Sequence, residues 1–162
     1  AGGEGSDMHL RLERASSELP ADCEAVFRNS AIYERYFQDP GRLELSLRRA
    51  AAQGELYLAV SEDGELAGAM RVVMTGFCGL YPYLSLIGVR DTFRGQGVGS
   101  FLMEHLEDMA LRAGARRVTL MVSDFNQRAQ AFYRSRGYWL LGSLPDAVKP
   151  GIGELVMVKD LQ

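Results

Sequence analysis

Apolar positions near the start of the chain follow two periods, and each period predicts a different kind of element. The stretch HLRLERA, residues 9–15, alternates between apolar and polar side chains as a half-buried strand does. A helix is predicted from about Pro20 to Ile32, because proline costs little in the first turn of a helix, where its missing N–H has no intrahelical partner to lose.

A second helix follows in the pattern of residues 39–54. Leu43, Leu47 and Ala50 recur at helical spacing and share one face. Asp39 is a suitable N-cap, with Pro40 in the first helical position, and a glycine at position 54 ends the helix.

Alternation returns in the middle of the chain. ELYLAVSE and ELAGAMRVVMT, residues 55–62 and 65–75, are separated by Asp-Gly, which tolerates the positive φ of a tight hairpin turn. YLSLIGV, residues 83–89, predicts a third strand. These segments therefore predict consecutive strands of one sheet.

The second half of the chain alternates helices with strands. A long helix is predicted from Val98 to Gly114, followed by a strand at 117–123. Another helix runs from about Asn126, a plausible cap, to Arg136, and two strands at 138–143 and 154–158 close the chain. The apolar positions of the long helix are Val98, Phe101, Leu102, Leu106, Met109 and Ala113.

Composition indicates one ordinary domain over residues 8–162, with residues 1–7 as a flexible leader or a tag remnant. The chain has 162 residues, of which 47% are hydrophobic, and no apolar run approaches the roughly 20 residues that span a bilayer. A net charge of −3 disfavours nucleic-acid binding. We therefore expect neither a nucleic acid nor a membrane as a partner.

The metal-binding side chains are few and scattered. Cys23 and Cys78 lie far apart and outside any CxxC pattern, which favours reduced thiols and a cytoplasmic protein. His9 and His105 make no recognisable metal spacing with them, so no metal is predicted.

Arg94-Gly95-Gln96-Gly97-Val98-Gly99 stands between a predicted strand and the long helix. Glycines weaken regular elements, so local stability does not explain three of them in five positions. Backbone N–H groups at a helix start have no intrahelical acceptor, and the helix dipole adds positive charge there. The turn is therefore a candidate phosphate site, unless it is only a tight turn that needs glycine.

Two known phosphate-binding motifs match the sequence of this turn poorly. The P-loop pattern requires a lysine that this turn lacks. The dinucleotide pattern G-x-G-x-x-G begins at Gly95 and Gly97 but then meets Ser100. Asp124 stands at a suitable distance for that reading, but too few elements follow it to complete a doubly wound sheet.

A third pattern fits better. Residues 94–99 match [QR]-x-x-G-x-[GA], and NQRAQAFYRSRGYW, residues 126–139, places an Asn before a helix that carries Ala and Phe-Tyr and ends at Gly with an aromatic. Both motifs resemble those of the GNAT superfamily of N-acetyltransferases. The resemblance implies a mixed α/β fold with a mostly antiparallel sheet of about seven strands, splayed between the fourth and fifth, and about four helices.

The resemblance also implies acetyl-CoA as the acyl donor. Its pyrophosphate would lie on the turn, and its pantetheine arm would pair with backbone near Ile87 and Val89. Arg94 either touches phosphate or only braces the turn, and Asn126 is a helix cap that in relatives often also contacts the cofactor. Arg90, Arg128 and Arg134 are all candidates for the adenosine 3′-phosphate. The expected cofactor-binding residues are Ile87, Val89, Arg94, Gly95, Gln96, Gly97, Val98, Gly99, Ser100 and Asn126.

The resemblance nominates Tyr133 as the acid that protonates the departing thiolate, although spacing alone favours a buried core residue. Many relatives carry a glutamate as base where this chain has Ser85. The base is left open, with a water chain as an alternative to four carboxylates that flank the acceptor groove. The four are Glu34, Asp39, Asp146 and Glu154.

The expected function is transfer of an acetyl group from acetyl-CoA to a primary amine of a small molecule or peptide, by direct attack. A protein N-terminal acetyltransferase and a noncatalytic acyl-CoA-binding or sensing module are the alternatives, and a homodimer is a further expectation. Five aromatic residues line an acceptor pocket or belong to the core. They are Tyr33, Tyr36, Phe37, Tyr81 and Tyr83.

Overall fold

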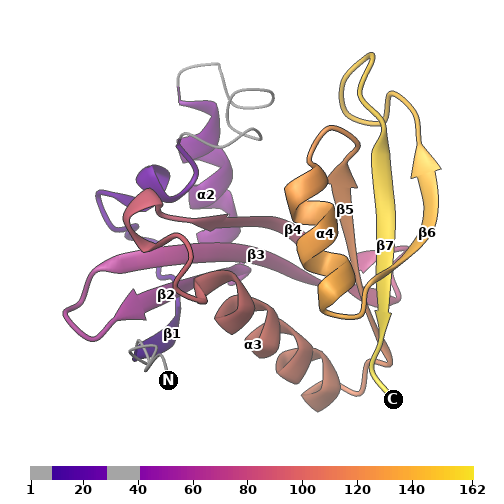
Figure 1. The fold of residues 1–162 in the computed structure, drawn as a ribbon. Coiled ribbons are helices and arrows are strands. Elements are labelled where there is room, and N and C mark those ends of the chain that lie inside the picture. Colours follow the sequence, from indigo (N-terminus) through magenta and orange to yellow (C-terminus); the bar gives the residue numbers. More distant parts are fainter. Residues whose placement is uncertain (1–8, 29–40) are drawn as a thin grey trace, which may run out of the picture. The chain divides into compact units, whose positions relative to one another are not determined.

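The structure is a computed structural model that describes residues 9–28 and 41–162 (Figure 1). The chain divides into two units. Unit 1 comprises residues up to Arg71 together with Leu86–His105, and unit 2 comprises Val72–Ser85 together with Leu106–Gln162. Two strands and one helix contribute residues to both units, and each unit is described by itself.

Unit 1 contains an antiparallel arrangement of strands whose alternation the sequence predicts. β1 (Leu10–Arg14) pairs with β2 (Leu56–Ser61), and β2 pairs with the first half of β3 (Leu66–Phe77), as Figure 1 shows. Gly64, in the turn between β2 and β3, has a φ of 82°. The Asp-Gly hairpin is therefore confirmed, because glycine adopts this left-handed conformation without strain.

Helix α2 (Arg42–Ala52) covers part of the core of unit 1. Leu43, Leu47 and Ala50 are buried on its inner face, as their spacing predicts. The predicted cap was wrong: the N-cap position is occupied by Gly41, whose φ is 78°, and Asp39 lies outside the described residues. Gly41 has no side chain that could cap the helix, so only its left-handed backbone conformation marks the start of α2.

The helix expected from Pro20 to Ile32 is not found within the described part of that range. A 3₁₀ helix occupies Cys23–Val26 only, and residues 29–40 lie outside the described residues. Val26 and Phe27 are buried, so these apolar side chains serve the core from a short turn of helix. Three or four apolar positions do not distinguish such a turn from the end of an α-helix.

Unit 2 contains the parallel pair of the sheet. The first half of β4 (Tyr81–Val89) runs parallel to β5 (Arg117–Ser123), with Leu84 opposite Leu120. β7 (Glu154–Asp160) pairs antiparallel with β5 on one side and with β6 (Trp139–Leu144) on the other (Figure 1). The predicted strands of the C-terminal half are thus confirmed.

Helix α3 (Val98–Arg112) contributes its first half to unit 1 and its second half to unit 2. In unit 2 its Glu107 is 8% exposed and lies between two cations. Its carboxylate binds Arg136 Nη2 at 2.9 Å and Lys159 Nζ at 2.7 Å, and Tyr138 donates its hydroxyl to it at 3.4 Å. This cluster connects the helix with β7 and the segment before β6.

The strand order is β1-β2-β3-β4-β5-β7-β6. This mixed, seven-stranded, mostly antiparallel arrangement confirms the predicted fold class. Three α-helices lie in the described residues, α2, α3 and α4 (Gln127–Ser135), against about four expected. Within the described chain no helix is both long and apolar enough to cross a membrane, and no three His, Cys, Asp or Glu residues are grouped to hold a metal ion.

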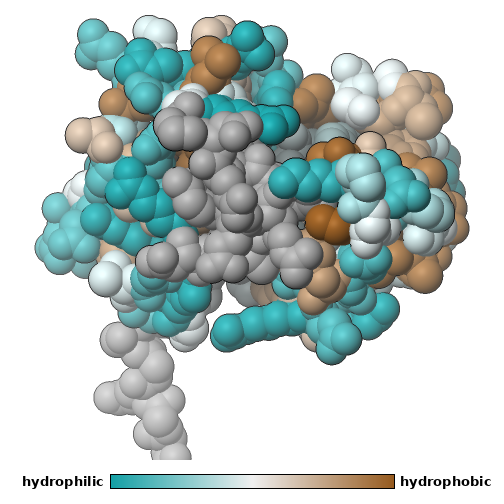
Figure 2. Space-filling model, turned by 90° about the horizontal axis from the view of Figure 1, so that it is seen from above, coloured by the Kyte–Doolittle hydropathy of each residue, from teal (hydrophilic) through white to brown (hydrophobic). Residues whose placement is uncertain are grey.

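Strand β6 forms one edge of the sheet and carries large apolar side chains on the surface. Figure 2 shows hydrophobic residues gathered on one side of the molecule. Exposed strand edges offer unpaired backbone groups to a further strand. The exposed apolar residues on and just after β6 are Trp139, Leu140, Leu141, Leu144 and Val148. The expected homodimer stays a prediction.

The Glu107 cluster leads to a stability prediction. Glu107→Gln should lower the free energy of unfolding by about 2 to 4 kcal/mol, because two cations lose their buried counter-charge. Asp108→Asn is the matched control on the same helix, since its ion pair with Arg112 is exposed and should contribute less than about 1 kcal/mol. Urea unfolding of the two variants tests this, and equal losses would show that the cluster does not stabilise the fold.

Candidate functional site

The glycine turn in unit 1 has the backbone that the sequence suggests. After β4, a 3₁₀ helix at Asp91–Phe93 leads into the turn, and α3 begins at Val98. Gly95 and Gly97 have φ values of 75° and 82°, so both need glycine for conformational reasons. Glycine at these two positions is therefore explained by the turn itself.

The turn also leaves space beside its backbone. A methyl group built on Gly95 or Gly97 meets no atom within 4 Å. The Gly97 carbonyl accepts the N–H of Phe101 at 3.0 Å, so the helical hydrogen bonds begin there. The N–H groups of Val98, Gly99 and Ser100 belong to the first turn, where no intrahelical acceptor exists. These amides lie at the positive end of a 15-residue helix, directly after a turn with free space at Gly95 and Gly97, and together they form a suitable anion site.

The start of α3 is fixed by close packing on the sheet. Val98 and Leu102 are buried, and a methyl group on Gly68 of β3 would lie 2.8 Å from Val98 Cγ1 and 3.3 Å from Leu102 Cδ1. Gly68 therefore allows the helix to lie directly on the strand. Gly68 is not among the predicted site residues, and a glycine inside an apolar strand is the signal that could have found it.

Arg94 and Gln96 both contact the turn that carries them. Arg94 Nη2 forms an ion pair with Asp91 at 2.8 Å, and Gln96 Nε2 donates to the Thr92 carbonyl at 3.1 Å. These contacts support the bracing role for Arg94, and its contact with phosphate stays a prediction. Among the arginines considered for a 3′-phosphate, Arg90 is paired with Asp22 at 2.9 Å. Arg128 and Arg134 are exposed.

Asn126 in unit 2 is the N-cap of α4. Its Oδ1 accepts the N–H of Ala129 at 3.2 Å, and its carbonyl accepts the N–H of Gln130 at 3.1 Å. The predicted cap is confirmed. A cofactor contact at this residue stays a prediction.

Tyr133 is buried on the inner face of α4. Among the described residues its ring contacts Phe132 and Tyr138, with centroids 5.5 and 5.7 Å away. Burial raises the pKa of the Tyr133 phenol above its ordinary value near 10. The hydroxyl therefore stays protonated throughout the physiological pH range, as a proton donor requires.

The residues considered as a base occupy different surroundings. Ser85 is an exposed residue of β4, while Glu34 and Asp39 lie outside the described residues. Asp146 is exposed, and its Oδ1 accepts the N–H of Gly151 at 2.6 Å. Glu154 is 5% exposed, whereas most carboxylates in proteins are exposed to solvent. Ser123 Oγ donates to its Oε1 at 2.9 Å.

The five aromatic residues considered for an acceptor pocket also occupy different surroundings. Tyr33, Tyr36 and Phe37 lie outside the described residues. Tyr83 is half-buried on β4, and burial and the charge of Glu154 raise its pKa. Tyr81 instead accepts a hydrogen bond from Arg117 at 3.1 Å.

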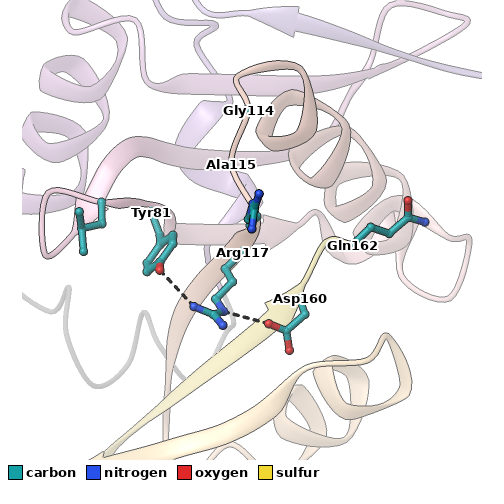
Figure 3. A pocket seen from close by; sticks show the side chains of 8 residues that line it. Tyr81, Gly114, Ala115, Arg117, Asp160 and Gln162 are labelled. Carbon is teal, nitrogen blue, oxygen red and sulfur yellow. Dashed lines mark hydrogen bonds and ion pairs between the residues drawn. The ribbon is translucent and has the colours of Figure 1, made fainter.

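A hollow of about 530 Å³ lies beside Tyr81 and Arg117 (Figure 3). Figure 3 shows the Arg117 guanidinium between the Tyr81 hydroxyl and Asp160, bound to both. Arg117 begins β5 and Ser123 ends it, so the hollow is roughly 20 Å of strand away from the Ser123–Glu154 contact. Tyr81 is the one described residue among the predicted site residues that lines this hollow.

Comparison with known proteins decides the family. A model described as the Acetyltransferase (GNAT) family matches residues 19–138, which is more than half of the chain. The chain belongs to the GNAT family of acetyltransferases. The resemblance given by the glycine turn and the α4 motif is therefore confirmed, and the expected enzyme class with it.

Curated proteins similar to this chain include distant relatives. Protein YdhI of Bacillus subtilis, uncharacterized, is 28% identical over 114 residues, 64% of this chain and 68% of that protein. Streptothricin acetyltransferase of Streptomyces lavendulae is 33% identical over 56% of the chain, and bovine thialysine N-epsilon-acetyltransferase is 38% identical over 34%. The matches span only 48% and 32% of these last two proteins.

Solved structures show the same fold. A GCN5-related N-acetyltransferase from Kribbella flavida has a TM-score of 0.69 at 25% identity, over 94% of this chain and 98% of that one. An aminoglycoside 6′-N-acetyltransferase complexed with coenzyme A has a TM-score of 0.71 at 17% identity, over 94% of this chain and 97% of that one. The fold is that of GNAT acetyltransferases along nearly the whole chain.

Proposed function

We propose that this GNAT protein transfers the acetyl group of acetyl-CoA to a primary amine of a small molecule or peptide, by direct attack of the amine on the thioester. The observation that carries the proposal is the turn at residues 94–99, where the family pattern coincides with free space at Gly95 and Gly97 and with the start of α3. A dinucleotide is not supported, because the chain matches an acetyltransferase family instead.

The pyrophosphate of acetyl-CoA is assigned to the amides of Gln96 to Ser100. Backbone N–H groups at a helix start offer several hydrogen bonds to phosphate oxygens without a lysine. Arg94 supports the turn through Asp91. By resemblance, backbone at Ile87 and Val89 binds the pantetheine arm, and Asn126 contacts the same arm in addition to capping α4.

Tyr133 is assigned as the acid. When the amine displaces sulfur from the carbonyl carbon, the departing thiolate gains from receiving a proton. The raised pKa of the buried phenol keeps that proton available at assay pH, but it also weakens the acid. The role therefore depends on the position of the hydroxyl beside the thiolate as much as on acidity.

The proposed acceptor substrate is a primary amine. The curated relatives that carry substrate names act on thialysine and on streptothricin, and one solved neighbour acts on aminoglycosides. Their names support a small-molecule amine more than a protein N-terminus. Cys23 and Cys78 are free thiols, which supports action in the cytoplasm.

Ligand binding and thiol release test the function as a whole. Acetyl-CoA should raise the melting temperature, because a ligand stabilises the state that it binds, and NAD should not. The protein should then release free thiol from acetyl-CoA when a suitable member of a panel of primary amines is added. Protection by acetyl-CoA without thiol release for any amine would favour the noncatalytic module, and protection by NAD alone would contradict the proposal.

The phosphate role of the turn leads to a matched pair of variants. Gly97→Ala and Gly114→Ala each place a methyl group at a φ near 80° with nothing within 4 Å, so both should lose about 1 to 2 kcal/mol of stability. Only Gly97→Ala should also weaken acetyl-CoA binding, by about tenfold or more, because its methyl group occupies ligand space. Calorimetric titration measures the acetyl-CoA affinity of both variants. Equal affinities would show that the turn does not bind the pyrophosphate.

The chemical role of Tyr133 is tested by Tyr133→Phe, which keeps the ring contacts with Phe132 and Tyr138. Turnover should fall by about 10² to 10⁴, the range for one general acid, with acetyl-CoA affinity little changed. Because the phenol pKa is raised, wild-type turnover should show no loss from phenol ionisation up to pH 10. If the variant keeps wild-type turnover under conditions in which the chemical step limits the rate, Tyr133 is a core residue and not the acid.

A further inference from the structure

The last residues of β5 in unit 2 extend beyond the pairing of this strand with β4. Within the described chain that pairing covers Thr119 and Leu120, whereas β5 continues to Ser123, which is 5% exposed. A buried backbone carbonyl that has no neighbouring strand needs a hydrogen bond from elsewhere, because leaving it unpaired costs free energy. The donor at this end of β5 comes from helix α4.

The side chain of Gln130 supplies the hydrogen bonds. It is 7% exposed, and its Nε2 donates to the Ser123 carbonyl at 3.1 Å and to the Asp124 carbonyl at 3.0 Å. The backbone N–H of Gln130 donates to the Asn126 carbonyl at 3.1 Å. Gln130 is thus bound, through side chain and backbone, to three residues of the segment that leads from β5 into α4.

This segment is also attached to the strand on its other side. The Asp124 N–H donates to the Gly153 carbonyl at 2.9 Å, and Asp124 Oδ2 accepts the Gly153 N–H at 2.9 Å. Gly153 directly precedes β7. The side chain of Gln130 therefore connects α4 to a point that the strands of unit 2 already fix.

Gln130 and Tyr133 are the buried residues of α4. They are three positions apart, so they are neighbours on one face of the helix. Packing alone would favour an apolar side chain at position 130, because a buried amide costs free energy unless it is hydrogen-bonded. Apolar contacts have no preferred direction, whereas hydrogen bonds fix a distance and an angle. A glutamine at this position therefore defines where the helix lies on β5.

The far end of α4 is held by other contacts. Arg136, the C-cap, binds Glu107 of α3 at 2.9 Å through its Nη2. The Tyr133 ring contacts aromatic residues within the helix and just after it. These contacts leave the placement of the N-terminal turn of α4 on β5 to Gln130.

We propose that Gln130 is a positioning residue that sets the place of the Tyr133 hydroxyl for acetyl transfer. This assignment rests on the proposed role of Tyr133 as the acid. Gln130 acts through the helix, because its hydrogen bonds fix the turn of α4 that precedes Tyr133. A displacement of about 1 Å in a reacting group can cost a factor of about 10² in rate. Loss of these hydrogen bonds should therefore slow the reaction although no reacting group is removed.

Gln130→Met tests the assignment, because methionine is unbranched and has no N–H donor in its side chain. Thiol release from acetyl-CoA is measured well below the melting temperature, with spermidine, kanamycin and the tripeptide Lys-Gly-Gly as probe amines. Turnover should fall by about tenfold to hundredfold, while acetyl-CoA affinity changes little. Gln127→Met is the matched control, since it makes the same change at an exposed position of α4, and it should keep turnover within about twofold.

A double-mutant cycle with Tyr133→Phe separates positioning from a merely structural role. If Gln130 acts through the Tyr133 hydroxyl, adding Gln130→Met to Tyr133→Phe should lower turnover by less than about twofold further. A merely structural role would lower the melting temperature of Gln130→Met and leave the turnover of the folded protein unchanged. That result, or losses that multiply in the double variant, would overturn the assignment alone.

Should Gln130→Met not fold, Gln130→Lys retains an N–H donor for the two carbonyls and should keep turnover within about fivefold of wild type. A folded Gln130→Lys that loses about tenfold or more would overturn the assignment. Wild-type turnover in Tyr133→Phe would contradict the acid role and the assignment of Gln130 with it. A wild-type protein that releases no thiol with any of the three amines would contradict the proposed function as a whole.

Discussion

The contact between the first turn of α3 and the backbone of the strands is the constraint on which the candidate site depends. A methyl group on Gly68 would lie 2.8 Å from Val98 Cγ1 and 2.9 Å from the Gly88 carbonyl. A methyl group on Gly88 would lie 2.6 Å from the Phe27 ring. Real side chains essentially never approach so closely, so helix and strands meet here without a side chain between them.

This packing has a direct consequence for the glycine turn. Because Val98 and Leu102 are held against Gly68, the amides of the first turn of α3 have fixed positions before any ligand arrives. The ion pair between Arg94 and Asp91 restricts the turn further. A ligand that binds such amides orders little of the protein, so less of the interaction energy is lost on binding. Packing in unit 1 therefore supports the phosphate binding that is proposed for the turn.

Much of the fold and the family could be predicted from the sequence, because alternation, helical spacing and two motifs are local signals. The turn at Gly97, the cap at Asn126 and the strands of the second half were all found in this way. Gly41 replaced Asp39 as a cap because backbone conformation decides that position. The burial of Glu154 could not be predicted, since it depends on Ser123, which is 31 residues away along the chain.

The amides of Gln96 to Ser100 are proposed to bind the pyrophosphate of acetyl-CoA. Amide hydrogen exchange of the wild-type protein, with and without saturating acetyl-CoA, tests it at the atoms concerned. Exchange at these amides should slow by about tenfold or more when the ligand is bound, because each hydrogen bond must open before exchange. Unchanged exchange at these amides, with protection appearing at another segment instead, would contradict pyrophosphate binding at the turn.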